Sequence, residues 1–416
     1  MRSSTRLILA TCFLATACES VPDVMTPPSD LATPPAYPSH AHAVAVSGSV
    51  RMEAHFTDLR GGITQDSSLL NHLIWLIDNA PAKSQIRAAI YSLDMTGVSE
   101  ALHRAKKRDV QVFVVMDGRH AEDSMPDEPH RLRDSLGASF RWCSNGQSLV
   151  STPGWNGCIA SAADANMHSK LFMFSRTRDA TGTQRNWVVW FGSANPSPQS
   201  GIETYNNSVT VYGDRTFYDE FRRRYWRALW DGNRGFVDND FFDRSDGRGF
   251  FSGSTFGLRV FASPQQERDL VLERIKDLKT GKDDPQCTIH VAQSMFRNAR
   301  IGVARLLAKK SNRCRVVVAV QTIGPEPLAV LDSANIPVWC TNTHDKFFLL
   351  RGSYGKLSGE RRLVFTGSHN FNEQANYTND ELLVRVEDPT MYAAFVDSWQ
   401  RMTSDEDSHI AGPGGC

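Results

Sequence analysis

An internal repeat constrains the fold of this chain more than any other feature. Residues 84–117 and residues 287–321 both have the order strand, helix, strand, with apolar runs at the strands and helical periodicity between them. A chain of 416 residues with such a repeat is expected to fold into two similar lobes. The expected strands are residues 86–91, 110–115, 288–292 and 316–320, and the expected helices are residues 98–107 and 301–310.

The segments around each repeat predict the architecture of the lobes. A helical segment precedes each unit, at residues 67–79 and 267–279, and a short strand follows it, at residues 139–142 and 336–339. Strands joined through helices imply crossover connections. The expected fold class is therefore α/β, with two pseudo-symmetric α/β/α lobes on mixed, largely parallel sheets. The lobes are expected at residues 48–249 and 250–405.

The N-terminus predicts export. Arg2 and Arg6 precede an apolar run at residues 7–17 that is too short to span a bilayer, as in a secretory signal peptide ending at residue 18. Cys18 follows an Ala-x-Ala cleavage pattern, or it is the acylated cysteine of a bacterial lipobox. Residues 19–47 are Pro- and Ala-rich and resemble a linker. We expect a cell-envelope lipoprotein or a secreted protein, with a flexible tail at residues 406–416.

The cysteines beyond the signal segment are expected to form disulfides in an oxidising compartment. Cys143 and Cys158 flank a loop rich in turn residues, which favours a local disulfide. Cys287 and Cys314 begin strands that the repeat makes neighbours, so they are a second candidate pair. The sequence has no CxxC motif, which argues against zinc binding by cysteines. No metal and no other cofactor is predicted.

Two short motifs recur at the same point of each repeat. In each half a His-x-Lys tripeptide lies in an apolar strand, whose alternation puts both side chains on one face. A Gly-Ser-x-Asn turn follows at nearly the same spacing, at Gly192 in the first half and at Gly367 in the second. One copy alone would be ordinary turn chemistry, whereas two copies at matching spacing indicate a shared site. The residues are His168, Lys170 and Asn195, and His344, Lys346 and Asn370.

These residue types suit the cleavage of a phosphodiester without a metal. In-line attack on phosphorus needs a nucleophile, an acid for the leaving oxygen, and donors around the non-bridging oxygens. One imidazole can attack to form a phosphohistidine, while the other protonates the departing alcohol and then activates water. The lysines and asparagines of both motifs would hold the phosphoryl oxygens. Ser193 and Ser368 are expected to contribute to substrate binding.

With these motifs the chain resembles the phospholipase D superfamily, whose signature is a duplicated His-x-Lys motif followed by Gly-Ser-x-Asn. The resemblance covers nearly the whole mature chain. The family motif has an Asp five residues after the Lys, where this chain has Ser175 and Arg351, so it resembles the more divergent members. The resemblance implies the phospholipase D fold, with His168 as the nucleophile and His344 as the acid.

A nucleophilic imidazole is normally oriented by a carboxylate on its other nitrogen. Glu381 follows the second Gly-Ser-x-Asn turn at the distance where the family carries such a glutamate, so the resemblance implies this role for it. The competing interpretation is a solvated carboxylate at a strand edge. The corresponding stretch of the first half, residues 205–209, contains no acid, which leaves Glu203 as the candidate there.

Net charge helps to separate the functions that remain. Lys plus Arg and Asp plus Glu both number 46, so the chain has no global basic field to hold a nucleic-acid backbone. We expect a monomeric phospholipase D-like hydrolase that acts on phospholipid head groups at a membrane surface and can also transfer the phosphatidyl group to other alcohols. The alternatives are a secreted nuclease of the same superfamily and a catalytically inactive binding protein.

Overall fold

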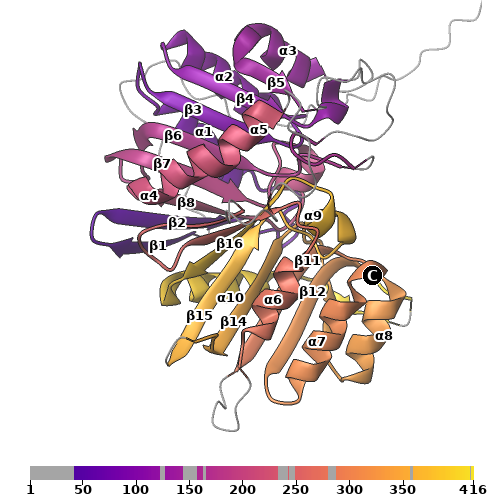
Figure 1. Ribbon diagram of the computed structural model, residues 1–416. Coiled ribbons are helices and arrows are strands. Elements are labelled where there is room, and N and C mark those ends of the chain that lie inside the picture. Colours follow the sequence, from indigo (N-terminus) through magenta and orange to yellow (C-terminus); the bar gives the residue numbers. More distant parts are fainter. Residues whose placement is uncertain are drawn as a thin grey trace, which may run out of the picture.

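The chain forms two α/β lobes, each built on one mixed sheet (Figure 1). The computed structural model describes residues 42–121, 127–143, 157–162, 165–232, 242, 249–279, 287–356, 359–412 and 414–416. The signal segment, Cys18 and the linker up to residue 41 lie outside the described residues.

The N-terminal lobe has an eight-stranded sheet in the order β1-β2-β8-β7-β6-β3-β4-β5. Its strands are β1 (His42–Ser47), β2 (Val50–Phe56), β3 (Gln85–Ile90), β4 (Gln111–Met116), β5 (Phe140–Trp142), β6 (Leu171–Arg178), β7 (Gln184–Gly192) and β8 (Asn207–Tyr212). Its α-helices are α1 (Ser68–Asp78), α2 (Thr96–Lys107), α3 (Asp127–Leu136), α4 (Arg215–Glu220) and α5 (Arg227–Gly232). The shorter helical turns are η1 (Gly118–Ala121), η2 (Gly137–Ser139), η3 (Pro198–Ile202) and η4 (Phe221–Trp226).

The C-terminal lobe has a nine-stranded sheet in the order β17-β13-β12-β11-β14-β15-β16-β10-β9. Its strands are β9 (Phe250–Ser252), β10 (Arg259–Ser263), β11 (Thr288–Phe296), β12 (Arg315–Ile323), β13 (Val338–Cys340), β14 (Lys346–Ser353), β15 (Glu360–Gly367), β16 (Glu381–Glu387) and β17 (His409–Ile410). Its helices are α6 (Leu270–Lys276), α7 (Ile301–Ser311), α8 (Pro325–Ser333), α9 (Glu373–Tyr377) and α10 (Pro389–Thr403), with the turn η5 (Asn298–Arg300).

The repeat predicted from the sequence is confirmed. The unit β3-α2-β4 in one lobe matches β11-α7-β12 in the other, and β5 and β13 extend each unit by a further parallel strand. The registers also match, because Ala88 pairs with Phe172 and Val291 pairs with Phe348. The prediction that the sheets are largely parallel is wrong. Only these three-stranded units are parallel, since strands β6 to β8 and β14 to β16 follow one another as antiparallel neighbours.

Two predicted boundaries need correction. Residues 42–47 belong to the first lobe and not to a linker, because they form β1 and pair with β2. The C-terminal residues are not a free tail, since β17 pairs with β13 and Cys416 forms a disulfide with Cys340. The two disulfides expected from the sequence, Cys143–Cys158 and Cys287–Cys314, are both present.

Helix α10 joins the lobes through a shared core. Its N-cap is Asp388, whose carboxylate accepts hydrogen bonds from two backbone N–H groups of the first turn, and Pro389 occupies the first helical position. The ring of Phe395 packs edge-on against Phe56 of β2 at 4.9 Å and against Phe347 of β14 at 5.1 Å. One apolar cluster therefore runs through both lobes. Across the described residues, no helix has the length and apolar character needed to cross a bilayer.

Candidate active site

The His-x-Lys segments of the two lobes meet through hydrogen bonds exchanged between the lobes. The backbone N–H of His168 donates to the carbonyl of Asp380 at 3.1 Å, just before β16. In the same way, the N–H of His344 donates to the carbonyl of Tyr205 at 2.9 Å, just before β8. Each histidine is thus held by the strand that follows the Gly-Ser-x-Asn turn of the opposite lobe. The structure brings both motifs into one site.

His168 is paired with a buried carboxylate from the other lobe. Its Nδ1 lies 2.9 Å from Oε1 and 3.0 Å from Oε2 of Glu381, which is fully buried. Glu381 is therefore not a solvated strand-edge residue. Burial lowers the pKa of His168 well below its usual value, and the charges of Lys170 and Lys346 act in the same direction. The free site thus favours a neutral imidazole with Nδ1–H on Glu381, which leaves Nε2 as a nucleophile.

His344 is paired with an amide. Its Nδ1 lies 3.1 Å from Oδ1 of Asn206, which also accepts a hydrogen bond from the hydroxyl of Ser193 at 2.9 Å. Asn206 follows Gly192 at the same separation at which Glu381 follows the equivalent Gly367. The amide thus occupies the position that the carboxylate holds in the other half of the site.

The geometry contradicts the prediction that Glu203 is the acid paired with His344. Its side chain does not reach His344 but accepts a hydrogen bond from Nε2 of Gln65 at 3.0 Å. It lies three residues before Asn206, in the turn that follows η3 and precedes β8. The residue at the equivalent repeat position, Asn206, pairs with His344, although it is not an acid.

Both lysines are buried beneath the histidines. Nζ of Lys170 donates to the carbonyl of His168, and Nζ of Lys346 donates to the carbonyl of His344, each at 2.6 Å. Burial lowers the pKa of Lys346 to about 7. Burial, together with repulsion from Lys346, also holds the pKa of Lys170 well below its usual value. Two buried ammonium groups that repel each other are stabilised by a nearby anion, which suits a phosphoryl group.

The two asparagines of the turns are buried beside the histidines. Nδ2 of Asn195 donates to Oγ of Ser200 at 2.7 Å. The Oδ1 atoms of Asn195 and Asn370 are buried and accept no hydrogen bond from any described residue. Buried amides with an unused polar atom are available to a ligand. These side chains can therefore take part in binding a phosphoryl group.

The two serines of the turns contact the side chains that pair with the imidazoles, and their predicted part in substrate binding stays a prediction. The hydroxyl of Ser193 donates to Asn206, and that of Ser368 accepts from the N–H of Leu382 at 3.0 Å and hydrogen bonds Glu381. Each serine thus holds the side chain that orients a catalytic imidazole, and we describe both as positioning residues.

The N-terminal lobe adds residues that sequence reasoning missed. The ring of Tyr91 lies edge-on to His168 at 4.4 Å, and Nζ of Lys170 lies 4.6 Å from the centre of the same ring. Arg119 stacks over Tyr91 at 3.8 Å and donates to its hydroxyl at 2.5 Å. Asp117 is buried and accepts from the N–H of Met167 at 2.8 Å, and burial raises its pKa to about 8. These side chains follow the carboxyl ends of β3 and β4, the usual edge for a site.

The matching edge of the C-terminal lobe is uncharged. By the registers given above, Tyr91 and Asp117 correspond to Ser294 and Gln321. The hydroxyl of Ser294 donates to Oε1 of Gln321 at 3.0 Å. The two halves of the site thus have equivalent backbone positions but different side chains. Tyr91, Asp117 and Arg119 form a charged and aromatic wall beside His168, whereas the amide of Gln321 lies at the matching position of the other lobe.

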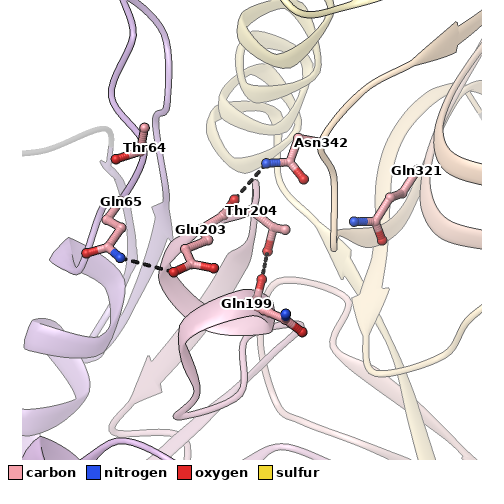
Figure 2. A pocket seen from close by; sticks show the side chains of 7 residues that line it. All are labelled: Thr64, Gln65, Gln199, Glu203, Thr204, Gln321 and Asn342. Atoms are coloured by element: carbon pink, nitrogen blue, oxygen red, sulfur yellow. Dashed lines mark hydrogen bonds between the residues drawn. The ribbon is translucent and has the colours of Figure 1, made fainter. Parts of the chain in front are cut away.

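A polar cavity of about 440 Å³ lies between the lobes (Figure 2). Asn342, two residues before His344, donates to the carbonyl of Glu203 at 2.7 Å and so joins the two lobes at this cavity. The side chain of Glu203 is the one charged group among the described lining residues. The lining residues are Thr64, Gln65, Gln199, Glu203, Thr204, Gln321 and Asn342.

Comparison with known proteins agrees with this geometry. The family model described as "Cardiolipin synthase, PLD-like domain" matches residues 73–230 and 284–403. No curated protein matches the chain at a significant level.

Two solved structures share the fold. Phosphatidylserine synthase of Haemophilus influenzae aligns at 13% identity and a TM-score of 0.54, over 86% of this chain and 87% of that one. Polyphosphate kinase of Porphyromonas gingivalis aligns at 16% identity and a TM-score of 0.51, over 85% of this chain, which spans only 50% of the kinase. With both family segments matched and both motifs brought into one site, the chain belongs to the phospholipase D superfamily.

Proposed function

We propose that this protein is a phospholipase D-type hydrolase that releases the head group of phospholipids at the cell envelope. Nε2 of His168 attacks phosphorus, and the bond from phosphorus to the head-group oxygen breaks. His344, protonated on Nε2, donates that proton to the leaving alcohol. The products of this step are a free head-group alcohol, a phosphatidyl group bound to His168, and a neutral His344.

The observation that carries the proposal is the unequal pairing of the two imidazoles. The attacking imidazole becomes positively charged when it bonds to phosphorus, and the carboxylate of Glu381 on Nδ1 of His168 stabilises that charge. Asn206 can orient His344 but adds no negative charge, so the protonated form of His344 gives up its proton readily. The pairing therefore favours His168 as nucleophile and His344 as acid.

The second step restores both imidazoles. Neutral His344 takes a proton from water, the water oxygen bonds to phosphorus, and the bond from phosphorus to His168 breaks to give phosphatidic acid. An alcohol can replace water in this step, which gives transfer of the phosphatidyl group. The lysines and asparagines of the motifs hold the phosphoryl oxygens in both steps.

The polar cavity between the lobes supports a small neutral or amine-bearing leaving group. We take the alcohol that His344 protonates to leave toward this cavity, because Asn342 in its lining precedes His344 by two residues. The cavity offers amides, hydroxyls and the carboxylate of Glu203. A nucleic-acid leaving group carries further phosphates, which Glu203 would repel and no lysine or arginine among the described lining residues would hold. We therefore favour a lipid head group over a nucleotide.

The test is head-group release from mixed phospholipid vesicles by the mature protein, run with EDTA beside digestion of single-stranded DNA. We expect release from vesicles, and loss of that release in His168→Ala. His409→Ala, which changes an exposed histidine on β17, is the matched control and should keep full activity.

The outcomes separate the competing functions. DNA cleavage without head-group release would favour a nuclease. Activity toward neither substrate, with normal folding, would favour an inactive binding protein. Glu203→Gln provides a finer test, because it should raise KM for an amine-bearing head group by roughly 5- to 10-fold and leave a glycerol head group unaffected.

A further inference from the structure

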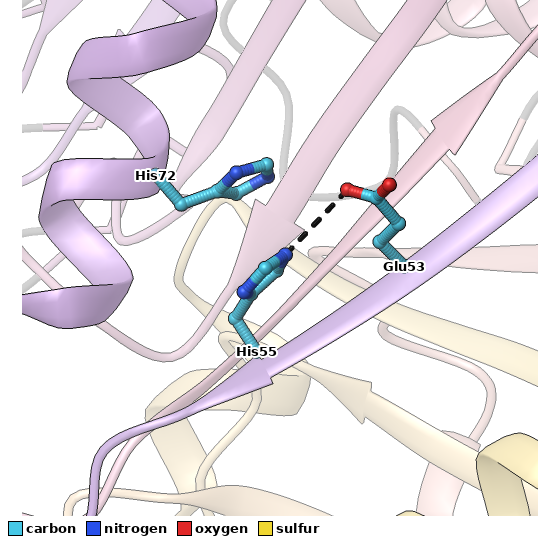
Figure 3. A group of neighbouring side chains, drawn as sticks. All are labelled: Glu53, His55 and His72. Atoms are coloured by element: carbon cyan, nitrogen blue, oxygen red, sulfur yellow. Dashed lines mark ion pairs between the residues drawn. The ribbon is translucent and has the colours of Figure 1, made fainter. Parts of the chain in front are cut away.

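A second group of histidines lies in the N-terminal lobe, away from the His-x-Lys motifs. Glu53 and His55 stand two residues apart on β2 and therefore on one face of the strand, and His72 approaches that face from α1. Figure 3 shows the three side chains turned toward one another between strand and helix. Their potential ligand atoms all lie within 4.8 Å of one another.

This Glu53-His55-His72 cluster is buried. Glu53 and His72 have no exposed surface, and His55 is 5% exposed. Nε2 of His55 lies 3.6 Å from Oε2 of Glu53, and the rings of His55 and His72 stack at 3.9 Å. Around a tetrahedral ion with bonds near 2.0 Å, neighbouring ligand atoms are about 3.3 Å apart, so binding requires the ligand atoms to approach one another and the stacked rings to turn toward the ion. Buried charged groups are usually paired or coordinate a metal.

The contacts around the cluster resemble the outer shell of a metal centre. The hydroxyl of Thr210 lies 3.0 Å from Nε2 of His72, a contact of the kind that orients a ligating ring. Arg51 donates to Oε1 of Glu53 at 2.6 Å, and Tyr212 donates to Oε2 at 2.8 Å.

Arg51 lies between two buried carboxylates, Glu53 at 2.6 Å and Asp179 at 3.8 Å from its Nε. Asp179 is also paired with Arg185 at 2.7 Å, so two carboxylates and two guanidinium groups balance one another beside the cluster. Exposed His42 stacks on His55 at 5.7 Å, so the cluster lies directly beneath the surface.

We propose that Glu53, His55 and His72 bind one divalent transition-metal ion, Zn²⁺ by ligand type, that ties α1 to β2. Two imidazoles and one carboxylate suit zinc far better than calcium or magnesium, which prefer oxygen ligands. The ion is structural. Because the loop between β2 and α1 carries Thr64 and Gln65 of the polar cavity, the ion also holds that wall in place.

The test is titration of Zn²⁺ alone into chelator-treated full-length protein, followed by calorimetry and thermal unfolding. Working in the His344→Ala background removes zinc binding at the His-x-Lys motifs. We expect one equivalent to bind and the Tm to rise by a few degrees. His72→Gln and Glu53→Gln should weaken binding by more than the roughly 10- to 100-fold that loss of an outer-shell contact costs. His409→Gln is the control and should bind zinc normally.

Several results would overturn the proposal that this cluster binds zinc. One is a folded protein that binds no zinc, and another is a set of variants that bind it as the parent does. If the variants do not fold, X-ray absorption of the zinc-bound parent decides, because the site requires two imidazole ligands. Head-group hydrolysis well below the Tm should be unaffected by EDTA in either case. The result for the zinc site therefore does not decide whether the proposed hydrolase activity is correct.

Discussion

The two halves of the active site share a backbone plan and differ in their side chains. Each histidine donates a backbone hydrogen bond to the opposite lobe, and each lysine donates to the histidine carbonyl at the same distance. Beside His168, however, stand a buried carboxylate and a charged aromatic wall, whereas His344 meets Asn206 and a wall of amides. A duplicated fold therefore positions two equivalent imidazoles, and the residues at their Nδ1 atoms differ in charge, which is the basis of the two tasks proposed for them.

The largest effect expected is the loss of either imidazole. His168→Ala and His344→Ala should each lower kcat by about 10⁴-fold or more, because neither ring can replace the other. An activated substrate with a p-nitrophenolate leaving group separates the two roles. It should rescue a burst of p-nitrophenolate in His344→Ala, since that leaving group needs no acid, and give none in His168→Ala. Equal rescue of both variants would break the proposed division.

The next effect compares the two residues that contact Nδ1. Glu381→Gln should reduce kcat by about 10³-fold, because the charge on phosphorylated His168 loses its counter-ion. Asn206→Ala should cost only about 10-fold, since His344 loses orientation and no charge. Steady-state kinetics of both variants on one head-group substrate make the comparison. Similar losses of kcat in the two variants would mean that Glu381 and Asn206 contribute equally to catalysis.

A smaller change tests the pH dependence. His168 must be neutral and His344 protonated, and burial lowers the pKa of both below the usual 6.5. Activity should therefore fall as pH rises through the pKa of His344, which lies below 6.5. Asn206→Asp adds a negative charge beside His344, which raises its pKa and moves the alkaline limb to higher pH. A profile of kcat/KM against pH that is identical in the two proteins would contradict the assignment of His344 as the acid.

The smallest effect on activity is expected from the disulfides. Loss of either Cys143–Cys158 or Cys340–Cys416 should destabilise the protein by about 2–4 kcal/mol, measured by denaturant unfolding. Only the first should also slow turnover, by several-fold. The carboxylate of Asp380, next to Glu381, accepts from the N–H groups of Cys158 and Ala160, so that disulfide supports the His168 half of the site. Equal activity of the two variants would show that this support is unnecessary.

The repeat made much of the fold and site predictable from sequence. Two matched motifs at matched spacing are sufficient to bring together His168, His344 and their lysines, and the family position identified Glu381. The same repeat also contained the signal for Asn206, because its separation from Gly192 equals that of Glu381 from the second turn. Glu203 was chosen because it is an acid, although repeat position and not residue type determines which side chain reaches His344.

Other features depend on contacts that a single sequence does not encode locally. Tyr91 reaches His168, and Arg119 reaches Tyr91, because β3, β4 and β6 are neighbours in the sheet, and no motif marks these residues. The Glu53-His55-His72 cluster joins a strand and a helix whose residues have no recognisable ligand spacing. The antiparallel strands were missed because short apolar segments do not show the direction in which they pair.

The division of labour between the imidazoles is tested most directly by trapping the covalent intermediate. His344→Ala should be mixed with the p-nitrophenyl substrate, quenched in alkali, digested and analysed by mass spectrometry. Phosphorylation of the peptide that carries His168, and of no peptide that carries another histidine, is the expected result. A phosphorylated His344 in the parallel experiment with His168→Ala, together with an unmodified His168 in the first, would contradict it.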